Sequence, residues 1–238
     1  MFRSRGFTLL EVLVAVAISA AVGVAAVQLL SNVANVGKSS DERADEVAAL
    51  QRWNQILSRD ISQLINREIR DQYGDPLPSL MVGSGDYPLE FTLSGWRNRP
   101  TTEDPRSTLQ RVAYRSEPMD SEPCTPARER LALLEGVDEY DYETDFECLV
   151  RYYWHVLDRG DNSEPSTQVI YDQVSDFEIE LVVSLPALNG QDSPPELSSS
   201  DYWPPLTPEE GQRPVAIVVR TEMPAFGNIV RQWPIAHD

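Results

Sequence analysis

The chain has 238 residues, 41% of them hydrophobic, which is enough for one moderate domain with a buried core plus an appendage. Twenty Lys and Arg against 38 Asp and Glu give a formal net charge of -18, which argues against binding to nucleic acid or to anionic lipid headgroups. Two Cys and two His without a CxxC pair offer no structural zinc site, and we expect no metal and no cofactor.

Residues 7–30 form an apolar segment that is long enough to cross a membrane. As a helix, its roughly two dozen residues would extend about 36 Å, comparable with the hydrocarbon core of a bilayer. Glu11 is its one charged residue. A cleaved secretory signal has a shorter apolar core and ends in a small-residue site, so a transmembrane helix is the better interpretation.

A short basic leader, residues 1–6, precedes this segment. It ends in Gly6, which is followed by Phe7 and, at the fifth position after Gly6, by Glu11. The stretch Arg3–Leu13 resembles the class III signal of type IV prepilins and type II secretion pseudopilins. The resemblance implies cleavage between Gly6 and Phe7 by an inner-membrane prepilin peptidase, followed by N-methylation of Phe7.

The same resemblance gives Glu11 a role in assembly. A carboxylate within lipid is costly and normally has a partner. Between packed helices it can neutralise the terminal amine of a neighbouring subunit, because opposite charges attract strongly at low dielectric. The leader arginines, Arg3 and Arg5, favour the cytoplasmic side, so the chain after Leu30 is expected in the periplasm, anchored by a single pass in the bacterial inner membrane.

Apolar residues continue at helical spacing beyond the membrane segment. They recur at intervals of three, seven, four and three residues, at Val47, Leu50, Leu57, Ile61 and Leu64. One side of a helix would then face a core, while charged residues are scattered over its other faces. The pattern predicts a periplasmic amphipathic helix over residues 31–70, which ends before the turn signal at residues 74–76.

From residue 71 onward the hydrophobic period changes to two, which is typical of strands with one buried face. Strands are predicted at residues 89–93, 110–115, 148–157, 167–174, 177–183 and 214–223. A long helix followed by hairpin-connected strands indicates an α+β fold. We expect a pilin-like arrangement, in which the antiparallel sheet of a β-rich domain, residues 71–238, covers the C-terminal half of the helix.

Two stretches have the composition of loops. Residues 186–214 are rich in proline, which cannot donate to a sheet ladder, so an excursion from the sheet is predicted, although Tyr202 and Trp203 could dock on the core or on a partner. Residues 135–147 carry acidic side chains and no basic one. They lack the spacing of a calcium loop, so a solvated loop is the better interpretation.

Several segments of the chain resemble the general secretion pathway protein J family. They are Arg67–Asp71, Tyr73–Pro76, Leu89–Thr92, Gly95–Asn98, Arg106–Arg115, Leu149–Arg151, Tyr153–Trp154 and Leu157–Arg159. These segments follow the order of the family over about the first two thirds of the chain. The proline-rich stretch carries no such motif.

This resemblance implies a minor pseudopilin of the type II secretion system. Such a subunit belongs to the tip complex, which primes assembly of a short periplasmic pseudopilus and supports export of folded exoproteins across the outer membrane. The partners implied are the minor pseudopilins of classes I, K and H, the major pseudopilin and the prepilin peptidase. Secreted exoproteins are further candidates.

Two other functions were weighed against this one. A minor type IV pilin for pilus assembly, adhesion or DNA uptake would share the N-terminal motif, but many major pilins have a disulfide loop near the C-terminus, and here both cysteines are mid-chain. For an enzyme, the sequence lacks a G-x-S-x-G elbow, and His155 and His237 stand in a predicted strand and next to the C-terminus. We expect no catalysis.

The two cysteines, Cys124 and Cys148, would lie in an oxidising compartment once the domain is periplasmic. Two buried free thiols are the other possibility, but a disulfide is predicted. It would close a loop of about two dozen residues at the base of the acidic stretch and contribute roughly 3 kcal/mol in the chain-entropy model.

The helix also has more apolar surface than one sheet needs. A band past the membrane includes Ala44, Val47, Ala48 and Gln51, and its small residues allow a second helix to approach closely. The alternative is that the band is only a membrane-proximal spacer, but amphipathic bands usually pack on another surface. We expect this surface to bind the class I minor pseudopilin by helix packing, after which class K is recruited.

Overall fold

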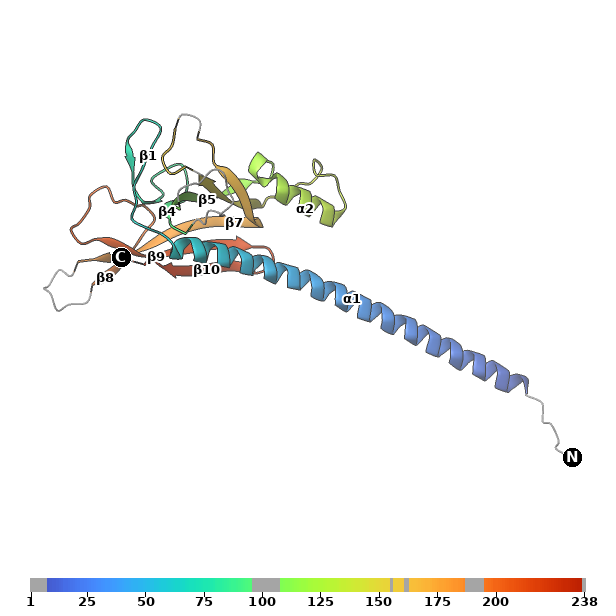
Figure 1. Cartoon of the computed structure of the whole chain (residues 1–238). Coiled ribbons are helices and arrows are strands. Elements are labelled where there is room, and N and C mark those ends of the chain that lie inside the picture. The colour runs from blue at the N-terminus through green and yellow to red at the C-terminus, as the bar shows by residue number, and fades with distance from the viewer. Residues whose placement is uncertain (1–7, 96–107, 155, 161–162, 187–194, 237–238) are drawn as a thin grey trace. The chain divides into compact units, whose positions relative to one another are not determined.

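The computed structural model describes residues 8–95, 108–154, 156–160, 163–186 and 195–236 (Figure 1). The chain divides into two compact units, residues 1–49 and 50–238. One helix, α1 (Leu9–Ser62), begins in the first unit and ends in the second. Outside the described residues lie His155, His237 and, from the family-like segments, residues 96–98 and 106–107.

In the first unit, α1 has the properties of a membrane-spanning segment. All side chains from Leu9 to Val47 are exposed, and an 18-residue window has a mean hydropathy of 2.4. Among the described residues, α1 is the one helix that is long and apolar enough to cross a membrane. Valine and leucine side chains in such numbers are unfavourable in water and favourable in lipid.

The second unit is built around an antiparallel sheet, which confirms the predicted α+β fold (Figure 1). The strand order is β10-β9-β7-β6-β5-β4-β3, β8 pairs with β7, and β1 and β2 form a separate hairpin. The strands are β1 (Ile69–Arg70), β2 (Pro76–Leu77), β3 (Leu80–Val82), β4 (Leu89–Leu93), β5 (Gln110–Pro118), β6 (Glu147–Trp154), β7 (Ser166–Leu185), β8 (Glu196–Ser200), β9 (Arg213–Met223) and β10 (Gly227–Pro234).

The prediction that α1 extends to about residue 70 is wrong, because the helix ends at Ser62. The chain after it pairs with the sheet. The Ile65 amide donates to the Thr92 carbonyl oxygen at 3.0 Å, and the Ser94 amide donates to the Gln63 carbonyl oxygen at 2.8 Å. These backbone groups are satisfied by strand β4 and its continuation rather than by another helical turn. Residues 69–70 then form β1.

Strand β7 joins two parts of the sheet. Residues 167–174 and 177–183 were expected as separate strands, but they belong to one strand that pairs with β6 up to Val174 and with β9 from Ser175 onward. The register shifts between Ser175 and Glu178, where Asp176 has a φ of 50°. Such a bulge bends a strand and increases its twist. The bend lets one strand serve both parts of the sheet.

We expect the backbone at Asp176 to govern this bend. Its side chain is exposed, but its left-handed conformation is unfavourable for β-branched residues. Asp176→Val should therefore lower the free energy of unfolding by about 1–2 kcal/mol, whereas Asp176→Gly should change it little. Glu178→Val, at an exposed position of the same strand, is the control for urea unfolding. Equal losses at both positions would contradict this explanation.

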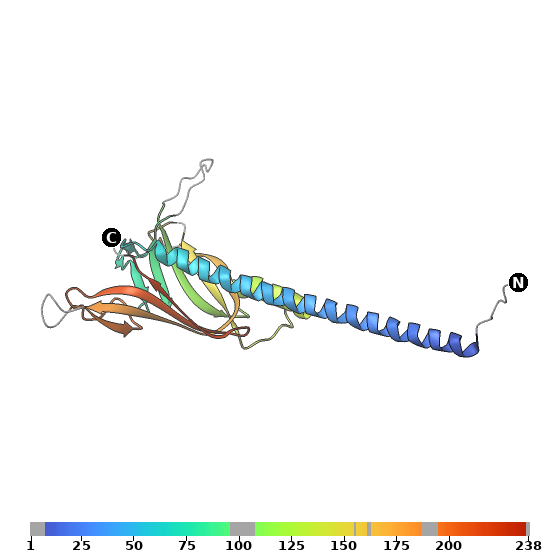
Figure 2. The same ribbon diagram turned by 90° about the horizontal axis from the view of Figure 1, so that it is seen from below.

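The last turns of α1 pack on the sheet in the second unit (Figure 2). Trp53, Leu57 and Ile61 are fully buried, as expected from the apolar stripe. The Trp53 ring meets the Trp233 ring of β10 edge to face, with 6.0 Å between centroids. Burying three large apolar side chains contributes several kcal/mol and fixes this end of the helix on the sheet.

A helix that the sequence analysis did not predict lies between β5 and β6. A 3₁₀ turn, η1 (Glu122–Cys124), leads into α2 (Thr125–Glu135), which ends at Gly136 with a φ of 74°. The buried face of α2 consists of Ala127 and Ala132 with the partly buried Leu131, while Leu133 and Leu134 are exposed. Hydrophobic periodicity misses such a helix because its inward face is made mostly of small residues.

The proline-rich stretch does not leave the sheet entirely, which corrects the prediction for residues 186–214. Its residues 196–200 form β8, which pairs with the end of β7. Further on, the Trp203 amide donates to Val82 O at 2.7 Å and the Val82 amide to Trp203 O at 3.0 Å. The segment therefore covers part of the free edge of β3.

Candidate functional site

The N-terminal end of α1 contains Thr8 and Glu11 in a capping box. The Thr8 amide and hydroxyl donate to Glu11 Oε2 at 2.9 and 3.0 Å, and the Glu11 amide donates to Thr8 Oγ1 at 3.3 Å. This arrangement satisfies backbone amides that the first turn of a helix leaves free. Glu11 therefore stabilises the start of α1, in addition to being the one charged residue of the apolar segment 7–30. Gly6 and Phe7 lie outside the described residues.

The predicted partner-binding stretch lies on one helix, α1, near the boundary between the two units. Ala44 and Gln51 are exposed, Val47 is 44% exposed and Ala48 is half-buried. The next large apolar residue, Trp53, is fully buried. The four residues thus precede the point at which the helix becomes part of the core, and their side chains are accessible to a partner.

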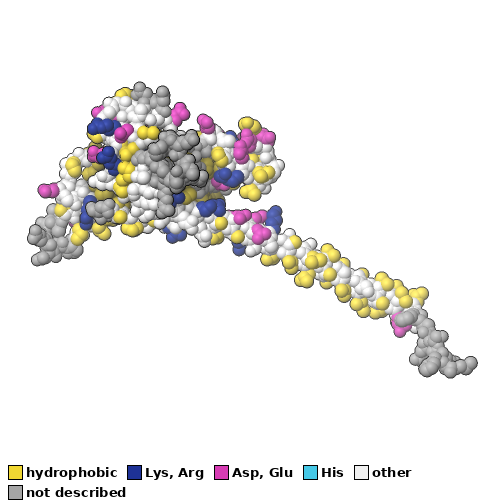
Figure 3. Space-filling view, viewed as in Figure 1, with side chains coloured by type: hydrophobic (Ala, Val, Ile, Leu, Met, Phe, Trp, Pro, Cys, Tyr) yellow, Lys and Arg dark blue, Asp and Glu magenta, His cyan; other side chains and the backbone are white. Residues whose placement is uncertain are grey.

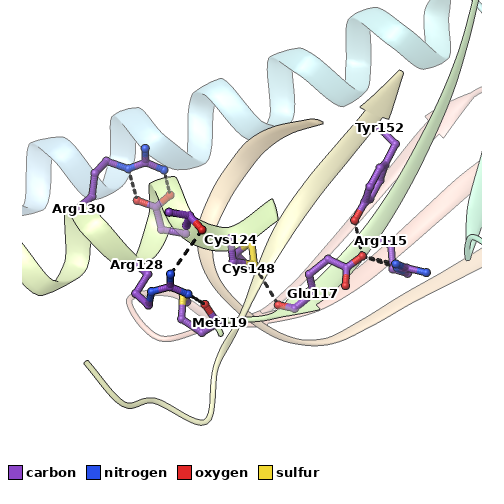
Figure 4. Close-up of a disulfide and its surroundings, with 10 residues drawn as sticks. Arg115, Glu117, Met119, Cys124, Arg128, Arg130, Cys148 and Tyr152 are labelled. Carbon is purple, nitrogen blue, oxygen red and sulfur yellow. Dashed lines mark hydrogen bonds and ion pairs between the residues drawn. A yellow bond between two sulfur atoms is a disulfide. The ribbon is translucent and has the colours of Figure 1, made fainter. Parts of the chain in front are cut away.

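The structure contains a disulfide between Cys124 and Cys148 (Figure 4). Their Cα atoms are 5.8 Å apart and both residues are fully buried. Around the sulfur atoms lies a cluster of buried side chains, which includes Met119, Tyr142 and Val150. The bond closes the segment that contains α2 and the acidic stretch, so this segment, residues 119–147, is held at its base. We call it the α2 lobe.

Three arginines near the disulfide make polar contacts within the fold (Figure 4). Arg128 Nη1 donates to the Met119 carbonyl oxygen at 3.0 Å, and Arg130 forms two hydrogen bonds to the Asp172 carboxylate on β7. Arg115 pairs with Glu117, which also accepts from the Tyr152 hydroxyl. Burial and this carboxylate raise the pKa of Tyr152, so its hydroxyl stays protonated. The lobe is thereby fixed to the sheet.

The family-like segments meet in a buried polar cluster centred on Glu90. Its Oε1 accepts from Arg111 Nε at 2.8 Å and from Arg159 Nη2 at 2.5 Å. Arg111, which has no exposed surface, also donates to the Thr92 hydroxyl and to two backbone carbonyl oxygens. Burial lowers the pKa of Arg111, and Glu90 opposes this effect. The cluster joins β4, β5 and the chain that follows β6.

Arg159 connects this cluster to the β1–β2 hairpin. Its guanidinium lies 4.2 Å from the centroid of the Trp154 ring, and its amide donates to the Arg70 carbonyl oxygen at 2.9 Å. The Arg70 amide donates in turn to Asp158 Oδ1 at 3.0 Å. Arg70, Asp158 and Arg159, which the sequence analysis listed only within family-like segments, therefore have a structural role: they hold the hairpin on the sheet.

A second buried charge, Asp60, joins α1 to the sheet. Its carboxylate accepts from the Tyr114 hydroxyl at 2.6 Å and from Arg151 Nε at 2.5 Å. Burial, followed by the Asp60 charge, raises the pKa of Tyr114, which keeps this hydroxyl a donor. Periodicity could not indicate Asp60, because it is a charged residue on the buried side of an amphipathic helix. The pairing was visible only in three dimensions.

An open groove of about 1000 Å³ lies between the end of β5 and the acidic stretch. Acidic and aromatic side chains line it, among them Glu139, Tyr140, Glu143 and Phe146. Within the described ranges, no group of three His, Cys, Asp or Glu side chains is placed to hold a metal ion.

Comparison with known sequences identifies the family. The sequence model described as "Type II secretion system (T2SS), protein J" matches residues 28–120 and 134–235, and the model of the prokaryotic N-terminal methylation motif matches residues 1–27. A methylation motif, a long apolar helix and an antiparallel sheet are features of pilin-like proteins, and the protein J match distinguishes a pseudopilin among them. The chain belongs to the type II secretion system protein J family.

Curated relatives agree with this assignment. Type II secretion system protein J of Klebsiella pneumoniae is 40% identical over 114 residues, which are 48% of this chain and 57% of that protein. The protein of the same name from Vibrio cholerae serotype O1 is 36% identical over 116 residues, 46% of this chain and 52% of that protein. The chain thus spans about half the length of the curated relatives it matches.

A solved structure shares the fold. A chain of the GspK-GspI-GspJ complex from the type 2 secretion system of enterotoxigenic Escherichia coli superimposes with a TM-score of 0.52 and 20% sequence identity. The match covers 81% of this chain and 98% of that one. At this identity the likeness establishes the fold, a helix packed on an antiparallel sheet.

Proposed function

We propose that the protein is a minor pseudopilin of the type II secretion system, and that it enters the tip complex through the surface of α1 around Ala44, Val47, Ala48 and Gln51. Membership of the protein J family supports the secretion role over that of a type IV pilin. The GspK-GspI-GspJ complex supports classes I and K as the partners. The role is structural rather than catalytic.

The observation that carries this proposal is the accessibility of a helix surface with small side chains. Ala44 and Ala48 are one helical turn apart, and neither belongs to the fully buried face formed by Trp53 and Leu57. Alanines allow two helix backbones to approach closely, so that a partner helix gains dispersion contacts along the band. A soluble form, residues 36–238, retains the whole second unit and this surface.

The test is co-purification of residues 36–238 with the class I minor pseudopilin from the same genome. Ala44→Glu with Ala48→Glu places two charges in the contact and should reduce recovery of the partner at least tenfold. The control is Asn35→Glu with Ser39→Glu, which adds the same charges on the opposite side of the helix. Because Asn35 precedes residue 36, this control is made in a longer form, residues 31–238. If the Ala44/Ala48 variant binds like its control, the partner contacts another surface.

Processing and assembly follow from the same assignment. We propose that an inner-membrane peptidase cleaves between Gly6 and Phe7, that Phe7 is then methylated, and that residues 7–30 anchor the chain with its second unit in the periplasm. Glu11 would pair with the terminal amine of a neighbouring subunit in the fibre. The exposure of Glu11 at the first turn of α1 supports this role, since its carboxylate is accessible from outside the helix.

A further inference from the structure

The α2 lobe has exposed apolar side chains that do not pack on the core of the second unit. Leu133 is 82% exposed, Leu134 is 83% exposed, Tyr140 is 84% exposed and Val137 is 44% exposed. Helix α2 packs on the core through Ala127, Ala132 and the partly buried Leu131 instead. The four exposed residues lie within one turn of the end of α2 or just after it, and we call them the α2 patch. Apolar side chains grouped in this way are typical of interaction surfaces.

The surroundings of the α2 patch are acidic. Glu135, Asp138, Glu139 and Asp141 alternate with its apolar residues along the chain. Of the two arginines of α2, Arg130 is paired with Asp172, and Arg128, which lines the groove beside Glu139, offsets only one of these four charges. Figure 3 shows acidic and hydrophobic side chains next to each other over the lobe. The patch therefore has a negative rim.

The patch is also held in place before any partner arrives. The Cys124–Cys148 disulfide closes the base of the lobe, the Arg130–Asp172 pair fixes α2 to β7, and the Tyr142 hydroxyl accepts a hydrogen bond from Gln173 at 3.0 Å. A surface that is already ordered loses little conformational entropy on binding. This rigidity distinguishes the α2 patch from exposed apolar residues in a mobile loop.

We propose that the α2 patch is a second docking surface, which binds a protein segment with apolar side chains flanked by Lys or Arg. The acidic rim selects this partner. An anionic membrane would be repelled, and a second copy of the same patch would bring like charges together. The proposal goes beyond the role of α1, since it concerns residues 133–140 of the α2 lobe and not residues 44–51 of α1.

A model peptide tests the chemistry of this surface. The probe is a fluorescent amphipathic peptide of about 16 residues, made only of Leu and Lys and long enough to form a helix on binding. It is titrated into residues 36–238 at physiological salt, beside a peptide in which Ser replaces Leu. Leu133→Ser with Leu134→Ser removes the apolar centre, and Asp138→Asn with Asp141→Asn removes part of the rim.

The chain offers matched controls for both changes. Tyr73 and Leu206 are 81% and 88% exposed and lie outside the lobe, so Tyr73→Ser with Leu206→Ser is the apolar control. Glu209→Gln with Glu210→Gln is the charge control at an exposed acidic pair. The patch variants should bind the Leu-Lys peptide about tenfold more weakly, which is about 1.4 kcal/mol, while the controls stay within about twofold of wild type.

Three results of the peptide titration would overturn the proposal. One is no measurable binding of the Leu-Lys peptide. Another is equal binding of the Ser-Lys peptide, since net charge alone would then explain the attraction. The last is an equal loss in the control variants. In cells, a photo-crosslinker at Leu134 of the full chain should capture a peptide that contains Lys or Arg beside apolar residues. A photo-crosslinker at Leu206 is the control. Cross-links from Leu134 to lipid or to an acidic segment, or a yield no higher than that from Leu206, would contradict the proposal.

Discussion

Glu90→Gln is expected to lower the free energy of unfolding by about 3–5 kcal/mol, because it removes the one carboxylate that faces two buried or half-buried guanidinium groups. Arg111 is fully buried and keeps its charge at any pH at which the protein folds. Its Nη2 atom, and Nε of Arg159, already have no hydrogen-bond partner in the described structure. The glutamine amide keeps the shape of the side chain, so the loss measured by urea unfolding reports the charge.

A surface ion pair of the same kind is the control. Glu180 pairs with Arg220 at 3.0 Å, and both side chains are partly exposed, so Glu180→Gln should cost less than about 1 kcal/mol. Combining Glu90→Gln with Arg111→Met removes the unpaired charge together with its partner. This double variant should regain part of the stability lost in the single one. If Glu90→Gln lowers the free energy of unfolding no more than Glu180→Gln does, the buried guanidinium groups do not depend on the Glu90 charge, and the explanation fails.

The same variant has a local consequence. Arg159 connects Glu90 to the β1–β2 hairpin through the Arg70 carbonyl oxygen. Amide hydrogen exchange should therefore accelerate in the hairpin, at residues such as Asp71 and Gly74, more than in β9 and β10. Uniform acceleration across the sheet would mean that the cluster stabilises the whole unit without a specific effect on the hairpin.

Cys124→Ser with Cys148→Ser is expected to lower the free energy of unfolding by about 3 kcal/mol, since the bond closes a loop with a sequence separation of 24 residues. Without the bond, α2 is held on the sheet by the Arg130–Asp172 pair and by a small apolar contact through Ala127, Leu131 and Ala132. Limited proteolysis should therefore cut first within residues 125–146. Residues 147–154, which form a central strand, should stay protected.

Reduction of the wild-type protein with dithiothreitol provides an independent comparison. It removes the same cross-link without changing the residues, so it should reproduce both the loss of stability and the early cut. The binding of the class I pseudopilin through α1 should be unaffected, because residues 44–51 lie outside the lobe. If the serine variant and the reduced protein unfold at the same urea concentration as the oxidised wild type, the loop-closure argument fails.

Some structural features were predictable because their cause is local. The apolar run before residue 30 predicts a membrane helix by length alone, and the alternation of residues 177–183 predicts a strand with one buried face. The disulfide followed from having two cysteines and an expected oxidising compartment. The stripe through Leu57 and Ile61 placed the core face of α1, although Val47, at its start, is 44% exposed.

The features of the candidate site also differ in whether a local sequence signal predicts them. The band of small residues at Ala44 and Ala48 was read from spacing within one helix, and the T-x-x-E spacing of Thr8 and Glu11 is a local signal for a capping box that the sequence analysis did not use. The Glu90 and Asp60 clusters have no such local signal, since each joins residues that are distant in the chain: Arg151 is 91 residues from Asp60. Resemblance to a family drew attention to Glu90 and Arg111 without giving their role.

By itself, the sequence determined the features whose energetic basis lies within one segment: the membrane helix, the strands with alternating side chains and the assignment to the protein J family. Tertiary structure decided where α1 stops, because pairing of residues 63–65 with β4 and its continuation competes with helical hydrogen bonds. It also decided that α2 forms with Leu133 and Leu134 outward, and that β8 and Trp203 follow the sheet. In each case the deciding contacts are non-local, and no periodicity in the chain encodes them.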